Sequence, residues 1–335
     1  MSATARPESI LALVRSFRES RVLLTAAQLD LFTYLARTPH TAGEATTHLR
    51  GDPRAVTILL DALSALGLLR KVRNRYRTAP AAAQLLSGDS PHSILPMVLH
   101  SASLWERWSE LTGLVRGEPK ARARAYAPRG PERMEAFIGA MDAIARAHAP
   151  EVVKAVRPGD ARNLLDIGGA SGTYTIAFLR SAPQMRATLF DLKPVIAMAR
   201  RRLAAERVLE RVTLAAGDFY RDRLPEGHDL ALLSAIIHQN SRTQNVALYR
   251  KVRRALVPGG RLIVRDYVMN PDRIGPRDGA LFAVNMLCGT PGGGTYTWQE
   301  IREDLKAAGF TRLRLLQKGD DRMNGIVEAF RPARG

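Results

Sequence analysis

The segment SAIIHQNSRTQN, residues 234–245, places His238 directly after an apolar run and before a series of amide and hydroxyl side chains. Histidine side chains titrate near neutral pH, so a histidine at the end of a strand can take a proton from a bound molecule. Gln239 and Asn240 could bind the oxygens of a substrate, or with Ser241 they could cap the helix that follows. The segment therefore makes His238 the first candidate for acid–base chemistry and leaves both roles open for its neighbours.

A glycine-rich segment, LLDIGGASG, ends another apolar run at residues 164–172. Gly168, Gly169 and Gly172 allow the backbone to approach a ligand, and the N-terminus of a following helix favours a negatively charged group. The spacing departs from the G-x-G-x-x-G pattern of dinucleotide-binding proteins. Alone, this loop indicates only a nucleotide-like ligand.

Two acidic residues and an aromatic residue follow the next two apolar runs. Asp191 ends the segment LFD, where a carboxylate can accept two hydrogen bonds from a ribose diol. In the segment GDF, Asp218 can accept from an exocyclic amine and Phe219 can lie against an adenine ring. Each could instead be a helix cap or a core residue. Because they fall at consecutive strand ends with the glycine loop, they predict a site for adenosine that carries a zwitterionic tail.

Apolar strand patterns alternate with helical patterns from residue 163 onward. We expect strands at 163–169, 187–192, 212–219, 228–238, 261–269, 312–317 and 325–330. Continuous apolar strands with intervening helices predict an α/β fold, a Rossmann-like parallel sheet covered on both faces, with ligands at the carboxyl ends of its strands. The last two strands would form a hairpin, so we expect one edge strand to be antiparallel.

The first 150 residues have mostly helical patterns, in which three helices and a hairpin around Asn74 indicate a winged helix. Thr41 with Glu44 forms a possible capping box, and Asp52 is a possible N-cap. The third helix would expose a single arginine, Arg54, together with small polar and acidic residues. DNA readers need more donors on this face. We therefore expect a structural or dimer-forming module, although the basic hairpin could contact phosphates.

Composition narrows the class of protein further. The chain has 335 residues, with 50 Lys and Arg against 32 Asp and Glu, a net charge of +18 that permits nucleic-acid binding but is spread along the chain. A single cysteine, Cys288, excludes an intrachain disulfide and a cysteine-rich metal site. No secretory signal and no membrane-length apolar run is visible. We expect a soluble cytoplasmic protein, no metal and no membrane partner.

The chain resembles the class I S-adenosylmethionine (SAM)-dependent methyltransferases, most closely the small-molecule O-methyltransferases with an N-terminal winged-helix dimerisation domain. The segments that carry the resemblance are SRVLLTAAQLDLF, DPRAVTILLDALSALGLL, LLDIGGASG, GDF, LVPGGRLIV and LKAAGF. It implies a seven-stranded sheet, a homodimer, and three parts: a dimerisation domain at 1–90, a helical linker contributing to the acceptor pocket at 91–155, and a SAM-binding catalytic domain at 156–335. Ala170 departs mildly from the family, because a glycine is common at its position.

The resemblance also implies the roles of individual residues. SAM, with S-adenosylhomocysteine (SAH) as product, would be bound by Gly168, Gly169, Gly172, Asp191, Leu192, Gly217, Asp218, Phe219 and Ser234. His238 occupies the position of the family's general base, and Asp266 that of the acidic residue that orients it. Phe137, Met141, Gln239, Asn285, Met286 and Tyr296 are expected in the acceptor pocket.

Two departures concern the catalytic segments. Gln239 and Asn240 stand where the family usually has Asp-Trp, and Thr295 and Tyr296 stand where many members have Glu-Arg, so a second catalytic carboxylate is missing. We expect methyl transfer to a hydroxyl, or to a carbon, of a small aromatic or polyketide-like molecule. Two alternatives remain: a SAM-binding enzyme of the same fold that catalyses hydroxylation or rearrangement, and a winged-helix regulator that binds DNA.

Overall fold

The computed structural model describes residues 6–126 and 131–333, without the side chains of 131–136, 143 and 144. Its contacts divide the chain into two compact units. One unit comprises residues 1–105 with 130–143, and the other comprises residues 106–129 with 144–335. The long helix α10 (Pro131–Val156) therefore contributes to both units.

The first unit is mostly helical. Its helices are α1 (Pro7–Arg15), α2 (Phe17–Gln28), α3 (Leu31–Arg37), α4 (Ala42–Leu49), α5 (Pro53–Ala65), α6 (Pro80–Leu86) and most of α7 (Leu95–Ser109). The predicted capping box of Thr41 and Glu44 begins α4, and the Asp52 side chain caps α5. Strands β1 (His40–Thr41), β3 (Arg75–Thr78) and β2 (Leu69–Val72) form a small sheet in that order, with the expected hairpin between β2 and β3.

The third helix of the predicted winged helix is α5. It buries Val56, Leu60 and Leu63, and on its exposed side Asp61 accepts hydrogen bonds from Lys71 Nζ and Tyr76 Oη, both at 2.7 Å. An acidic side chain paired with the hairpin does not suit a helix that reads DNA. This geometry favours the structural role expected from the sequence.

The second unit contains the predicted seven-stranded sheet, in the order β11-β12-β8-β7-β4-β5-β6. Its strands are β4 (Asn163–Ile167), β5 (Arg186–Asp191), β6 (Val212–Ala216), β7 (His228–Ser234), β8 (Leu256–Asp266), β11 (Thr311–Gln317) and β12 (Gly325–Phe330). Strands β4 to β8 are parallel, whereas β12 is antiparallel to both β8 and β11. The expectation of an antiparallel edge strand was wrong, because the hairpin inserts β12 between β8 and the edge strand β11.

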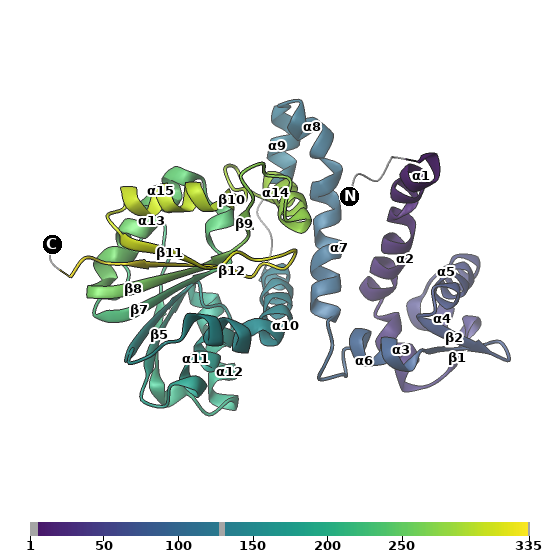
Figure 1. Cartoon of the computed structure of the whole chain (residues 1–335). Coiled ribbons are helices and arrows are strands. Elements are labelled where there is room, and N and C mark those ends of the chain that lie inside the picture. The colour runs from purple at the N-terminus through teal and green to yellow at the C-terminus, as the bar shows by residue number, and fades with distance from the viewer. Residues whose placement is uncertain (1–5, 127–130, 334–335) are drawn as a thin grey trace. The chain divides into compact units, whose positions relative to one another are not determined.

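Helices cover both faces of this sheet (Figure 1). Helices α13 (Arg242–Ala255) and α15 (Trp298–Ala307) bury apolar side chains against one face. Helices α11 (Thr173–Ser181), α12 (Lys193–Ala205) and the last part of α10 do so against the other. The carboxyl ends of β4, β7 and β8 lie side by side at one edge of the sheet, because Ile167 pairs with Leu233 and Ser234 pairs with Arg265.

Short elements complete the second unit. These are α8 (Leu111–Val115), α9 (Pro119–Ala125), α14 (Arg277–Gly289), the 3-10 turns η1 (Leu209–Arg211) and η2 (Ile237–Gln239), and the paired strands β9 (Val268–Met269) and β10 (Tyr296–Thr297). Cys288 is buried in a small cluster with Leu114, Ala121 and Ala125. Among the described residues, no helix is long and apolar enough to cross a membrane.

Candidate active site

His238 and Asp266 meet at the carboxyl edge of the sheet. His238 lies in the turn η2 after β7, and Asp266 is the last residue of β8. The imidazole Nδ1 lies 2.9 Å from Asp266 Oδ2 and 3.0 Å from Oδ1, and the carboxylate side chain is only 2% exposed. A carboxylate can only accept, so Nδ1 carries the hydrogen and Nε2 keeps a free lone pair. This is the tautomer that a general base requires.

Two further contacts hold the histidine in place. The ring of Phe282, on α14, meets the imidazole edge to face, with centroids 4.8 Å apart and planes at 89°. On the backbone side, Gly294 N donates to the His238 carbonyl at 2.8 Å. A Cβ at Gly293 would lie 2.4 Å from that carbonyl oxygen, so this glycine is required for the close approach of the loop. Asp266 and Phe282 therefore fix the imidazole, and Gly294 fixes the backbone of His238.

Asn240 has a structural role that neither sequence interpretation anticipated. It is fully buried; its Oδ1 accepts from Tyr220 Oη, and its Nδ2 donates to Asn245 Oδ1 at 3.0 Å. Its carbonyl accepts from Tyr296 Oη. The capping role belongs to Ser241 alone, which forms a capping box at the start of α13.

Gln239 is placed differently from Asn240. Its side chain is half-buried and makes no hydrogen bond with any residue that the structure describes. It is therefore available to a bound molecule, and its predicted place in the acceptor pocket stays a prediction.

Asp191 lies where the sequence predicted a ribose-binding carboxylate. Its Oδ2 accepts from Ala170 N at 2.8 Å and its Oδ1 from Leu192 N at 2.7 Å. Burial raises the pKa of Asp191, against the opposing effect of these two backbone donors. Each carboxylate oxygen retains a lone pair for a further donor, which is what a vicinal diol needs.

Packing also requires the glycines of the first loop. A Cβ at Gly169 would lie 2.7 Å from Leu189 Cγ and 3.0 Å from Asp166 Cγ, and at Gly172 it would lie 3.1 Å from Leu203 Cδ2. Gly172 also has φ +85° at the start of α11. Gly168 lies beside the predicted adenine-contacting ring, since a Cβ there would be 3.9 Å from Phe219 Cε1. The sequence thus located the loop correctly but gave an incomplete reason for two of its glycines.

The loop after β6 carries Asp218 and Phe219. Asp218 Oδ1 accepts from Tyr220 N at 2.8 Å, and the side chain remains 32% exposed. Lys251, on α13, donates from Nζ to three carbonyls of this loop, those of Phe219, Tyr220 and Asp222, at 2.8 to 2.9 Å. Gly217 comes directly before this loop, and a Cβ at Gly217 would lie only 2.5 Å from Phe190 Cζ. One lysine therefore fixes the loop that presents both predicted adenine contacts.

These residues suit SAM. Asp191 and Asp218 are acceptors with free lone pairs, which match the ribose hydroxyls and the adenine amine, and Phe219 offers an aromatic ring beside Gly168. Leu192, 42% exposed, precedes α12 next to Asp191, and Ser234 Oγ accepts from Arg265. No group of three or more His, Cys, Asp or Glu side chains in the described part of the chain is arranged to hold a metal ion.

The residues predicted for the acceptor pocket fall in two places. Asn285 and Met286 lie on α14, and Trp108 Nε1 donates to Asn285 Oδ1 at 3.0 Å. Tyr296 is buried, and its hydroxyl is already bound to the Asn240 carbonyl. Phe137 and Met141 belong to the other unit, where Phe137 is 41% exposed and its ring lies 5.2 Å from that of His100. Their role in a pocket stays a prediction.

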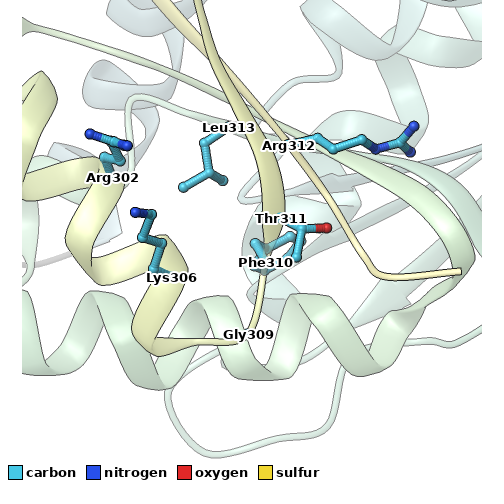
Figure 2. A pocket seen from close by; sticks show the side chains of 7 residues that line it. All are labelled: Arg302, Lys306, Gly309, Phe310, Thr311, Arg312 and Leu313. Atoms are coloured by element: carbon cyan, nitrogen blue, oxygen red, sulfur yellow. The ribbon is translucent and has the colours of Figure 1, made fainter. Parts of the chain in front are cut away.

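The hollow in Figure 2 is a different feature. Its lining residues are Arg302, Lys306, Gly309, Phe310, Thr311, Arg312 and Leu313. Thr311 pairs with Phe330, and Phe330 pairs with Arg261 near the amino end of the parallel strands. The hollow therefore opens at the edge of the sheet opposite His238 and contains no predicted site residue.

Sequence reasoning missed Phe282, Lys251 and Arg265. Phe282 and Lys251 act through packing and through backbone carbonyls, which no sequence motif signals. Arg265 did leave a signal, because an arginine inside the apolar strand RLIVRDYVM is unusual for a buried position.

Comparison with known proteins agrees with this geometry. Residues 115–311 match the family model of the O-methyltransferase domain, and residues 11–88 match the O-methyltransferase dimerisation domain. The chain is similar to the tetracenomycin polyketide synthesis 8-O-methyl transferase TcmO of Streptomyces glaucescens, with 34% identity over 92% of each chain. It is also similar to the 3-hydroxy-5-methyl-1-naphthoate 3-O-methyltransferase of Streptomyces sahachiroi, with 31% identity over 96% of this chain and 94% of the other. The solved structure of PigF with SAH superimposes with a TM-score of 0.85 at 25% identity, over 97% of this chain and all of the other.

The fold and site define a class I methyltransferase with a seven-stranded sheet and an N-terminal helical domain. The chain belongs to the O-methyltransferase family. It is a SAM-dependent enzyme that transfers a methyl group to a hydroxyl of a small molecule, and its dimerisation domain supports a homodimer.

Proposed function

We propose that the acceptor is a phenol on a fused aromatic ring system, and that His238 removes its proton. The observation that carries the second part is the contact of His238 Nδ1 with both oxygens of the buried Asp266 carboxylate. The acceptor class is supported by the two relatives, which are named for hydroxyl methylation of a polyketide and of a naphthoate.

In this mechanism the protein's main tasks are alignment and proton removal. SAM, when bound, supplies a methyl group on a sulfonium sulfur, which is already a strong electrophile. The Nε2 lone pair of His238 would take the phenolic proton while the phenolic oxygen accepts the methyl group that bound SAM would supply, with SAH as the product. Asp266 stabilises the resulting imidazolium, and Phe282 keeps the ring in its plane.

Asn285 supports an acceptor that carries a second oxygen. The indole nitrogen of Trp108 is only a donor, so the atom of Asn285 that it contacts must be the oxygen, and the Asn285 amide nitrogen is left without a partner among the described residues. Asn285 lies one helical turn beyond Phe282, on the same side of α14. We propose that it donates to a carbonyl or hydroxyl oxygen of the acceptor, beside Met286 and Gln239.

The remaining assignments belong to the same proposal. Gly168, Gly169, Gly172, Asp191, Leu192, Gly217, Asp218, Phe219 and Ser234 form the SAM site, within a catalytic domain at 156–335. Residues 1–90 form the dimerisation domain and 91–155 the helical linker, which carries Phe137 and Met141. The apolar residues Ile10, Leu13 and Val14 of α1 and Phe17 of α2, each more than half exposed, support burial of this surface against a second copy.

The test is methyl transfer to a panel of hydroxynaphthoates and hydroxyanthraquinones, with product identified by mass spectrometry. We expect a methyl ether from at least one phenol and about 10²–10⁴-fold less turnover for His238→Gln. SAH titration by calorimetry is the control, because this substitution should leave cofactor binding unchanged. If the variant binds SAH normally and keeps full turnover, His238 is not the base. If the wild-type protein methylates only amines or carbons, the acceptor is not a phenol.

A further inference from the structure

Arg265 is a buried cation for which the protein supplies no counter-charge among the residues that the structure describes. It is only 4% exposed and lies one residue before the end of β8. Its Nη1 donates to Ser234 Oγ at 3.1 Å, but its Nε has no hydrogen-bond partner, and no carboxylate in the described residues forms an ion pair with it. Buried charges in proteins are normally paired. The missing partner therefore indicates a ligand.

The position of Arg265 says where that ligand would be. Side chains alternate along β8, so Arg265 shares with Ile263 the face covered by α11, while Asp266 points to the His238 side. The guanidinium carbon lies 5.3 Å from the ring centroid of Tyr174, in the first turn of α11, and the buried Tyr174 hydroxyl also lacks a hydrogen-bond partner among the described residues. Gly168 follows Ile167 on β4, two strands away from Arg265. The two unsatisfied donors thus lie at the same edge as the glycine loop.

The chemistry of the cofactor supplies a matching group. The adenosine end is assigned to two carboxylates, Asp191 and Asp218, which would repel an anion. SAM carries a carboxylate on its methionine tail, at the other end of the molecule, and a guanidinium offers two parallel donors of the right geometry. We propose that Arg265, with the Tyr174 hydroxyl, binds the carboxylate of the cofactor's methionine tail. This inference rests on the SAM site proposed above.

The test compares two ligands that differ only in the tail. SAH contains the amino-acid carboxylate, whereas 5′-methylthioadenosine has the same nucleoside and thioether without it. In calorimetric titration of the full-length protein, Arg265→Met is expected to weaken SAH by about 10- to 100-fold, the range for a charge-assisted hydrogen bond, and to change 5′-methylthioadenosine by less than about twofold. Arg265→Lys keeps the positive charge but not the two parallel donors of the guanidinium, so its SAH affinity should lie between those of the wild type and Arg265→Met.

Controls separate binding from folding. Arg261 lies on the same strand but is fully engaged, by Glu328 at 2.9 Å and by the carbonyls of Val156 and Arg157. Arg261→Met is expected to lower the melting temperature without selecting between the two ligands. Arg265→Met should leave the ligand-free melting temperature unchanged or raised, because it removes an unpaired buried charge. Tyr174→Phe should cause a smaller loss of the same tail selectivity.

Three results would overturn the assignment. Equal weakening of both ligands by Arg265→Met would show a structural role, and unchanged SAH affinity would show no contact with the tail. Wild-type protein that binds 5′-methylthioadenosine as tightly as SAH would show that the tail is not bound at all. If the wild type bound neither ligand, the proposed SAM site itself would fail, and this proposal with it.

Discussion

The amide oxygen of Asn240 and the hydroxyl of Tyr220 are hydrogen-bonded to each other, although the two residues are separated by 20 positions. Asn240 follows the turn that carries His238, and Tyr220 lies in the loop that carries Asp218 and Phe219. The proposed base and the proposed adenine contacts are therefore connected by one side-chain contact.

Loss of this connection should affect both functions together. Asn240→Ala removes the partner of the Tyr220 hydroxyl and of the buried Asn245 side chain, and one unsatisfied buried group costs about 1–3 kcal/mol. We expect the free energy of unfolding in urea to fall by about 1–3 kcal/mol, with weaker SAH binding. Tyr220→Phe, which removes one bond, should lower stability by about 1 kcal/mol. Unchanged unfolding of Asn240→Ala would contradict the structural role.

Replacement of Asp266 by asparagine tests the orientation of the imidazole. In Asp266→Asn the new amide can donate to Nδ1, which would place the hydrogen on Nε2 and remove the lone pair that the mechanism needs. We expect turnover to fall by about 10²-fold or more with a small change in KM, while calorimetry shows normal SAH binding. A fall in SAH affinity of the same size would instead mark Asp266 as a structural residue.

Asp166 should make stability depend on pH. Burial raises its pKa to about 6, partly offset by the Thr175 hydroxyl and reinforced by Asp191. Between the ordinary pKa of 3.8 and about 6, the folded chain keeps a proton that the unfolded chain has lost. The contribution of Asp166 to the free energy of unfolding is therefore complete below the ordinary pKa and declines as pH rises through about 6.

The neutral variant Asp166→Asn should remove that decline. Without ligand, the free energy of unfolding of the variant minus that of the wild type should increase between pH 4 and pH 6, by on the order of 3 kcal/mol at most. Above pH 6 this difference should stay constant. Urea unfolding at pH 4.5 and pH 7.5 measures the difference. An equal effect at both pH values would mean that Asp166 titrates at its ordinary pKa.

Ala170 carries backbone strain in the cofactor loop. Its φ of +49° is left-handed, which costs an L-residue about 1 kcal/mol. Ala170→Gly is therefore expected to raise the free energy of unfolding by about 1 kcal/mol or less, since the greater chain entropy of glycine offsets part of the gain. Ala177→Gly, in the middle of α11, is the matched control and should lower it by about 1 kcal/mol. Two losses of equal size would show that position 170 is not strained.

Much of the fold could be predicted from the sequence, because helix caps and strands depend on residue type and on local patterns. The Thr41 capping box, the Asp52 cap and the strands that end at Ile167 and Asp191 follow from residue type and periodicity, although these strands were expected to end at 169 and 192. The pairing of His238 with Asp266 was also expected, but through family resemblance, since 28 positions separate them.

Other features depend on three-dimensional packing that no local pattern contains. The roles of Asn240 and of Gly169 come from neighbours on other elements, Tyr220 in one case and Leu189 in the other. The place of β12 could not be read from its hairpin, because a hairpin allows either strand to pair with β8.

The bond between Trp108 and Asn285 also provides an optical probe. The chain contains three tryptophans, and in the described part of the chain only Trp108 donates its indole hydrogen to a residue of the proposed acceptor pocket. Indole emission shifts with the polarity and hydrogen bonding of its surroundings. With Trp105 and Trp298 replaced by phenylalanine, intrinsic fluorescence would report entry of an acceptor without any label and independently of turnover.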